Sequence, residues 1–212
     1  MSIRVVVADD QEIVRTGLTM ILNVQPGIEV VGEAADGREA VSLARRLRPD
    51  VCLFDIRMPG MDGIEATRQL AGTGIAVVII TTFDLDEYVY GALQAGARGF
   101  LLKDAGPQLL SQAIHAAANG DALIAPNITV RLLKAFASGS PPKQPIEPLT
   151  DREEQVLLAT ARGKTNSEIA AELYISLSTV KTHVANLMAK LGARNRVEIA
   201  MWAYETNRVK KA

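Results

Sequence analysis

The N-terminal part of the chain alternates short apolar runs with longer amphipathic stretches, and this alternation constrains the fold more than any other feature. The apolar runs are rich in Val and Ile, as are parallel strands that are covered on both faces of a sheet. They fall at residues 3–8, 28–33, 50–55, 75–82 and 99–103. Between them, apolar residues recur at helical spacing near residues 13–22, 37–48, 62–72, 85–96 and 107–119. Five successive β–α units predict an α/β doubly wound, five-stranded parallel sheet with helices on both faces.

A change of pattern divides the chain after this region. Residues 138–148 contain four prolines and little apolar content, which indicates a linker. We therefore expect a first domain over 1–122, a linker over 123–148 with a helix at about 126–138, and a second domain over 149–212. The second domain has no strand pattern and is expected to be all-α, with four short helices.

Pairs of residues at capping-box spacing mark the starts of those helices. Thr150 with Glu153 and Thr165 with Glu168 fit the spacing in which a hydroxyl and a glutamate cap each other's backbone. Asn195 with Glu198 is a looser version.

The two parts of the chain also differ in charge. Residues 1–125 carry 10 Lys and Arg against 16 Asp and Glu, a net of −6, whereas residues 126–212 carry 13 against 8, a net of +5; together they give the formal −1 of the whole chain. This suggests a cation as ligand of the first part and a polyanion as partner of the second. The sequence has no signal peptide and no apolar run approaching about 18 residues, so we expect a cytoplasmic protein without a membrane partner.

Acidic and cationic side chains fall where the predicted strands end. Asp9 and Asp10 follow the first strand and Asp55 follows the third, which is its neighbour in the order 2-1-3-4-5. Clustered carboxylates need a cation, and oxygen ligands of this kind suit Mg²⁺. The fourth strand ends with Thr81 and the fifth with Lys103. A divalent ion, an ammonium and a hydroxyl around one carboxylate favour phosphoryl transfer to that carboxylate.

Four motifs carry this pattern: Asp9-Asp10, residues 54–63 (FDIRMPGMDG), Thr81-Thr82-Phe83 and residues 99–104 (GFLLKD). Together they resemble the flavodoxin-like receiver domain of two-component signalling, in particular its NarL/FixJ branch.

The resemblance implies a role for each residue. Asp55 would be the phosphoacceptor, and Asp9, Asp10, Asp55 and the backbone carbonyl of Arg57 would hold Mg²⁺. Lys103 would contact the phosphoryl group. Thr81 would be the switch hydroxyl, and Phe100 the aromatic that changes rotamer.

The second domain resembles a LuxR-type helix-turn-helix, which binds DNA. The resemblance lies in residues 149–153 (LTDRE), 163–170 (GKTNSEIA) and 175–184 (ISLSTVKTHV), with Lys190-Leu191 beyond. Ile169 is expected to pack on Val180, Val184 and Leu187 across a turn at residues 174–176.

The opposite face of the second helix is expected to enter the major groove of double-stranded DNA. Lys181 and Thr182 are predicted to contact bases. The predicted phosphate contacts are Lys164, Thr165, Ser178, Thr179 and Lys190. The last helix, near 195–206, has more apolar surface than a small domain needs to bury, which predicts a homodimer. The alternative is that Trp202 of this helix anchors the core of the domain.

The sequence thus predicts a transcription factor, not an enzyme, that a sensor histidine kinase phosphorylates on Asp55 to control dimerisation and DNA binding. Two alternatives stay open. One is a Mg²⁺-dependent phosphohydrolase with an aspartyl intermediate, although Asp55 is followed by Ile56-Arg57 instead of a paired aspartate and residues 149–205 would be unexplained. The other is an atypical regulator whose receiver works without phosphorylation.

Overall fold

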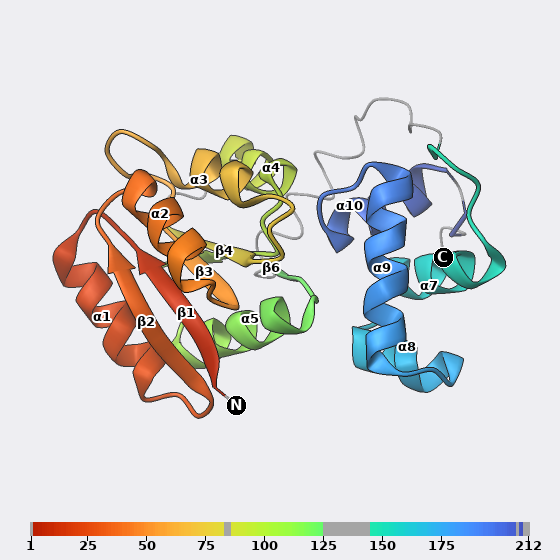
Figure 1. Cartoon of the computed structure of the whole chain (residues 1–212), viewed down its shortest axis with the longest axis horizontal. Helices are drawn as coiled ribbons and strands as arrows, with labels where there is room; N and C mark the ends of the chain where they lie inside the picture. The colour runs from red at the N-terminus through yellow and green to blue at the C-terminus, as the bar shows by residue number, and fades with distance from the viewer. Residues whose placement is uncertain (1, 83–85, 125–144, 207, 210–212) are drawn as a thin grey trace. The chain divides into compact units, whose positions relative to one another are not determined.

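The computed structural model describes residues 2–82, 86–124, 145–206 and 208–209. The chain divides into two compact units, one N-terminal and one C-terminal (Figure 1). The helix predicted at about 126–138 and most of the predicted linker lie outside the described residues. None of the described helices has the length and apolar content that a bilayer span requires.

The N-terminal unit is built on one parallel sheet. Its strands are β1 (Ile3–Ala8), β2 (Ile28–Ala34), β3 (Val51–Phe54), β4 (Ala76–Thr81), β5 (Gly99–Leu102) and β6 (Leu123–Ile124). Their order is β2-β1-β3-β4-β5-β6, and every neighbouring pair is parallel. The predicted order of the first five strands is confirmed. The short β6 was not predicted, so the sheet continues two residues into the segment that was assigned to the linker.

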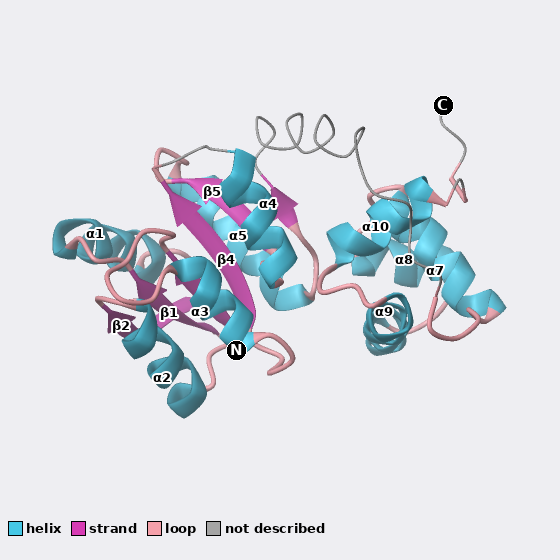
Figure 2. Ribbon diagram, turned by 90° about the horizontal axis from the view of Figure 1, so that it is seen from above, coloured by secondary structure: helices cyan, strands magenta, loops and turns pink. Residues whose placement is uncertain are grey.

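Helices cover both faces of this sheet. They are α1 (Glu12–Asn23), α2 (Gly37–Leu47), α3 (Gly63–Leu70), α4 (Asp86–Ala95) and α5 (Pro107–Asn119). Helices α1 and α5 contact each other on one face, while α3 lies between α2 and α4 on the other (Figures 1 and 2). The central strands β3 and β4 are buried along their whole length as a result. This explains why their sequences are continuously apolar instead of alternating.

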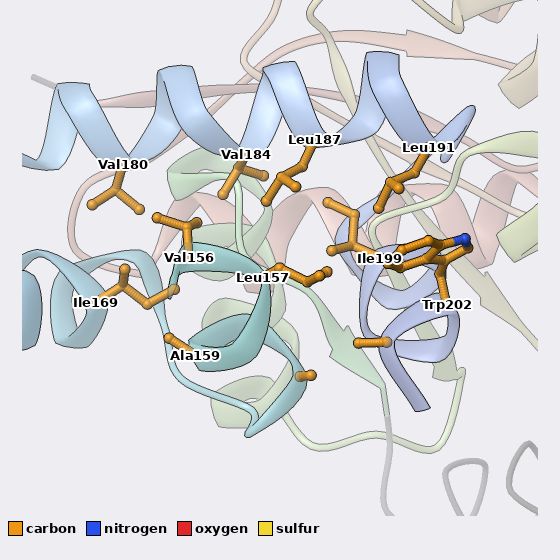
Figure 3. Packing of buried hydrophobic residues seen from close by; sticks show 12 residues of the cluster. Val156, Leu157, Ala159, Ile169, Val180, Val184, Leu187, Leu191, Ile199 and Trp202 are labelled. Carbon is orange, nitrogen blue, oxygen red and sulfur yellow. The ribbon is translucent and has the colours of Figure 1, made fainter. Parts of the chain in front are cut away.

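The described residues of the C-terminal unit form a bundle of four helices. They are α7 (Asp151–Ala161), α8 (Asn166–Leu173), α9 (Leu177–Leu191) and α10 (Arg196–Glu205). Figure 3 shows their apolar side chains meeting in one cluster, which contains Ile169 of α8 together with Val180, Val184 and Leu187 of α9. Trp202 of α10 closes the cluster and is 7% exposed.

Side-chain caps fix where these helices begin. The capping boxes of Thr150 and Thr165 are complete, since each threonine and its glutamate cap one another's backbone. The Asn195 side chain accepts from the backbone N–H of Glu198, and the Glu198 carboxylate accepts from the backbone N–H of Arg194. The looser third cap is therefore a shifted version of the same device.

The turn between α8 and α9 lies where the sequence predicts it. Tyr174 ends α8 in the left-handed conformation, with φ 54°, and Ser176 caps α9 by accepting from the backbone N–H of Thr179. A non-glycine residue in that conformation is uncommon, and here it ends the helix directly before the turn.

Candidate functional site

The predicted strand-end residues meet at one edge of the N-terminal sheet. Asp9, Asp55 and Lys103 each follow a strand directly, and the carboxyl ends of parallel strands share an edge. Backbone hydrogen bonds hold the strand ends in register: Asp55 N–H donates to the Ala8 carbonyl at 2.8 Å, and Lys103 N–H donates to the Thr81 carbonyl at 2.9 Å. The topology therefore brings together residues that are nearly a hundred positions apart.

The Lys103 ammonium lies between two of the carboxylates. Its Nζ is 2.5 Å from Asp9 Oδ2 and 3.1 Å from Asp55 Oδ2. Asp9 is fully buried and Asp55 is 4% exposed, whereas Asp10 is exposed. One carboxylate oxygen from each of the three aspartates lies within 4.8 Å of the others.

Burial changes the titration of Asp55. It raises the pKa of the Asp55 carboxyl above its usual value of 3.8, because removal from water disfavours the charged form. Lys103 opposes this rise through its charge and its hydrogen bond, while the negative charge of Asp9 adds to it. The net direction is upward, so Asp55 is a more basic carboxylate than one on the surface.

The donor set fits a divalent cation. Three carboxylates and one ammonium leave a formal charge of −2 in the cluster when all are ionised. Asp9 Oδ2 is buried, and its contact among the described residues is the ion pair with Lys103. Hard oxygen ligands with an uncompensated double negative charge are what Mg²⁺ binds in proteins. The cluster can therefore hold a metal ion.

Thr81 and Phe100 lie on β4 and β5, the two strands that follow β3 in the sheet. Thr81 is the last residue of β4 and is fully buried. Phe100 lies in β5 opposite Ile79, and it is also fully buried, so its ring is part of the core in this structure.

Arg57 has an exposed side chain that reaches α4. Its guanidinium donates to the Tyr88 hydroxyl at 3.1 Å and lies 5.8 Å from the centre of the Tyr88 ring. The side chain thus links the loop after β3 to α4. The predicted metal ligand is not this side chain but the backbone carbonyl of Arg57.

Two positioning residues were missed by the sequence analysis. A Cβ on Gly63 would come within 2.0 Å of the Asp55 backbone oxygen, so only glycine allows α3 to start this close to the phosphoacceptor candidate. Arg15 donates to the Asp9 carbonyl at 2.7 Å and pairs with Glu33 at 3.4 Å. Gly63 lies within the motif at residues 54–63. The residues next to Gly63 and Arg15 in the chain nevertheless do not indicate that these two contact the backbones of Asp55 and Asp9.

In the C-terminal unit, α9 presents one polar face to solvent. Ser178, Lys181 and Thr182 are exposed on it, while Val180 and Val184 point into the core. No described residue pairs with the Lys181 ammonium. Thr182 Oγ1 donates to the Ser178 carbonyl one turn earlier, at 3.1 Å. The face has the polar, partly cationic character of a groove-reading helix.

The remaining predicted contacts lie near the ends of α8 and α9. Thr165 is exposed at the capping box, and Thr179 is half-buried with its hydroxyl 2.7 Å from that of Ser176. Lys164 pairs with Glu172 at 2.6 Å, and both side chains are about one-third exposed.

Lys190 stands apart from this group. Its ammonium is 2.8 Å from Oε2 of the buried Glu153 and donates to the Pro148 carbonyl at 3.1 Å. In this structure Lys190 therefore helps to stabilise the fold of the unit, a role that the sequence does not indicate.

Known families match both units. Residues 5–115 match the response regulator receiver domain, and residues 147–203 match the luxR family of bacterial regulatory proteins. The transcriptional regulatory protein LiaR of Bacillus subtilis is 42% identical over 209 residues, which cover 98% of this chain and 99% of LiaR. The chain belongs to the LuxR-type response regulators. It is a DNA-binding response regulator of a two-component system, a family of transcriptional regulators to which the phosphohydrolase alternative does not belong.

Solved structures agree with this family. The response regulator ChrA of a haem-sensing two-component system is 38% identical with a TM-score of 0.55, and the match covers 98% of this chain and 99% of ChrA. A structure of two RcsB dimers bound to two parallel DNAs is 25% identical with a TM-score of 0.58, covering 97% of this chain and 99% of RcsB.

Proposed function

We propose that Asp55 accepts a phosphoryl group from a sensor histidine kinase in the cytoplasm and that this modification controls binding of the C-terminal unit to promoter DNA. The observation that carries the proposal is the position of Lys103, whose ammonium contacts both Asp9 and Asp55 within a cluster of three carboxylates.

The residues of the cluster divide the work of the transfer. An Asp55 carboxylate oxygen attacks phosphorus as the P–N bond to the kinase histidine breaks, and the imidazole leaves with the electron pair and takes up a proton. The Lys103 ammonium moves from the carboxylates to the phosphoryl group and balances the negative charge on its oxygens. Mg²⁺, held by Asp9, Asp10, Asp55 and the Arg57 carbonyl, would neutralise charge on those oxygens.

Thr81 and Phe100 link the modification to the surface. The new phosphoryl oxygens are strong hydrogen-bond acceptors. They would lie at the end of β3, beside the end of β4, where Thr81 is the last residue. We propose that Thr81 moves to donate to them and that Phe100 turns into the space it leaves. Because Phe100 is fully buried here, its rotation requires β5 and α4 to repack, which gives the domain two discrete states.

DNA recognition is assigned to the exposed face of α9. Lys181 and Thr182 would reach base edges, while Lys164, Thr165, Ser178 and Thr179 would hold phosphates. We leave Lys190 out of this set because its charge is paired with the buried Glu153, whereas the pair of Lys164 with Glu172 is about one-third exposed and can open toward a phosphate. A homodimer would place two copies of α9 on half-sites about one turn of DNA apart.

The test is phosphorylation of the full-length protein by a small phosphodonor with Mg²⁺. We expect wild type to gain the mass of one phosphoryl group, form dimers and bind promoter fragments more tightly, whereas Asp55→Asn does none of these. Asp104→Asn, which removes an exposed carboxylate outside the cluster, is the matched control and should behave as wild type.

Two outcomes would contradict the proposal. Equal phosphorylation of Asp55→Asn would show that another residue is the acceptor. Phosphorylation of Asp55 without any change in dimerisation or DNA affinity would favour the regulator whose receiver works without phosphorylation.

A further inference from the structure

A second charged feature lies at the opposite edge of the N-terminal sheet, where the strands begin. A cavity of about 570 Å³ opens there, and its walls include the residues directly before three strands: Asp50 before β3, Ile75 before β4 and Arg98 before β5. Strands of four to six residues separate it from the phosphorylation site by roughly 13–20 Å at 3.3 Å per residue. The two sites therefore share no residue.

The cavity is cationic although its domain is acidic. Three arginines line it, Arg45 and Arg48 from the end of α2 and Arg98 from the loop before β5, against the single carboxylate of Asp50. One oxygen of that carboxylate already accepts from the backbone N–H of Arg4 at 2.8 Å. Residues 1–125 as a whole carry a net charge of −6, so this local excess of positive charge is not the background of the surface.

Among the described residues, none of the three guanidinium groups has a carboxylate partner. Arg98 donates to the Ala117 carbonyl at 3.3 Å, and Arg45 donates to the Gln69 carbonyl at 3.3 Å. Burial lowers the pKa of Arg98, because its charge is withdrawn from water without a counter-ion. A buried guanidinium without a counter-ion is stabilised when an anion binds to it.

The backbone also fixes one side of this cavity. Arg48 ends α2 in the left-handed conformation, with φ 47°, which a non-glycine residue seldom adopts. Arg4 donates to the carbonyls of Leu47 and Arg48, at 2.8 and 3.2 Å, and so fixes the end of that helix. The position of Arg48 at the rim is therefore imposed by the fold.

We propose that this cavity binds a phosphorylated small molecule with at least two negative charges, such as a nucleoside di- or triphosphate or inorganic polyphosphate. All three cations are arginines, whose planar donor pairs match phosphate oxygens, and no lysine lines the cavity. Its volume lies in the range of small-molecule sites, which run from about 300 to 1,000 Å³. The receiver would then respond to a metabolite as well as to its kinase.

The test is isothermal titration of the full-length protein with tripolyphosphate and, separately, with ATP, without Mg²⁺ and at about 0.15 M salt, where exposed charges are screened. We expect one site per chain that saturates below about 1 mM. The double variant Arg45→Gln, Arg48→Gln should weaken binding at least about tenfold, because the loss of one charge-assisted hydrogen bond already reduces affinity by about that factor. Both arginines are exposed, so this variant should fold.

The matched control is Arg46→Gln. Arg46 is an exposed neighbour on α2 that does not line the cavity, so its loss changes net charge alone. Hydrogen exchange should show protection at residues 72–75 and 97–99. Tighter binding of ATP than of tripolyphosphate would identify a nucleotide, and equal binding would identify the phosphate chain; either supports the site.

Three results would overturn the proposal. These are no binding up to about 1 mM, an equal loss in Arg46→Gln, or protection at residues 176–186 instead of around the cavity. The first would mean that the arginines are only solvated, the second that attraction is unspecific, and the third that the anion occupies the DNA-binding face.

Discussion

The pair formed by Glu153 and Lys190 should carry a large share of the stability of the C-terminal unit. Glu153 is 3% exposed and the Lys190 side chain 19%, so Glu153→Gln would leave a mostly buried ammonium without its counter-ion. Glutamine is accepted at this capping-box position, so the substitution tests the charge pair and not the cap.

Breaking a buried ion pair on one side costs about 3–5 kcal/mol. The partial exposure of Lys190 and its hydrogen bond to the Pro148 carbonyl reduce this, and we expect a loss of about 2–3 kcal/mol at neutral pH. A unit of this size has about 3–10 kcal/mol in total. The loss should therefore be visible as a clear shift of the unfolding midpoint.

Trp202 provides the assay. It is the only tryptophan of the chain and lies in the core of this unit, so its fluorescence in urea follows unfolding of the C-terminal unit within the full-length protein. Glu154→Gln is the matched control, because Glu154 is a neighbour on the same helix whose more exposed pair with Arg208 contributes about 0–1 kcal/mol.

The pH dependence gives a second check. The hydrogen bond from Lys190, ahead of the other influences, holds the pKa of Glu153 below its usual 4.5. A lowered pKa means that the stabilisation is complete above about pH 4.5 and is lost as the pH falls through the folded-state value. The difference between wild type and Glu153→Gln should therefore shrink in acid. A loss no larger than that of Glu154→Gln, or a difference that grows in acid, would refute the reasoning.

Three further predictions concern the functional surfaces. Lys103→Met should raise the pKa of Asp55 further in metal-free protein, because it removes the ammonium 3.1 Å away; carboxyl NMR titration measures this, and a fall would contradict it. Gly63→Ala should slow phosphorylation and destabilise the receiver by about 1–3 kcal/mol, because the added Cβ clashes with the Asp55 backbone. Gly17→Ala is the control: this position in α1 has open space around it, so the variant should stabilise the receiver by up to about 1 kcal/mol. Lys181→Ala should weaken binding to a cognate promoter fragment by about 1–3 kcal/mol in a salt-controlled titration, and an unchanged affinity would remove this residue from the interface.

Much of the fold follows from local pattern. The continuous apolar runs of β3 and β4 and the amphipathic stretches between strands predict the parallel sheet, because only strands covered on both faces can be apolar throughout. Thr150 and Thr165 mark helix starts because a capping box is made by residues three positions apart. By contrast, β6 has only two residues and exists because it pairs with β5, so its own sequence carries no signal of its kind.

The candidate site was predictable to the extent that strand ends are predictable. Asp9, Asp55 and Lys103 were named together because each follows a strand, and Lys103 is moreover the only lysine in residues 1–125. The contact of Gly63 with the Asp55 backbone depends on where the chain returns after the loop, which is set by packing of α3 on the sheet. The neighbours of such a residue cannot be inferred from its place in a motif.

The sequence by itself determined the order of the elements, the caps, and the identity of the acids, the lysine and the exposed residues of α9, since all of these depend on neighbours in the chain. The tertiary structure alone decided that Lys190 pairs with Glu153, and it alone gathered Arg45, Arg48 and Arg98 around one cavity. The physical reason is that charge pairing acts over a few ångströms of space. Only the folded chain fixes which distant charges come within that range.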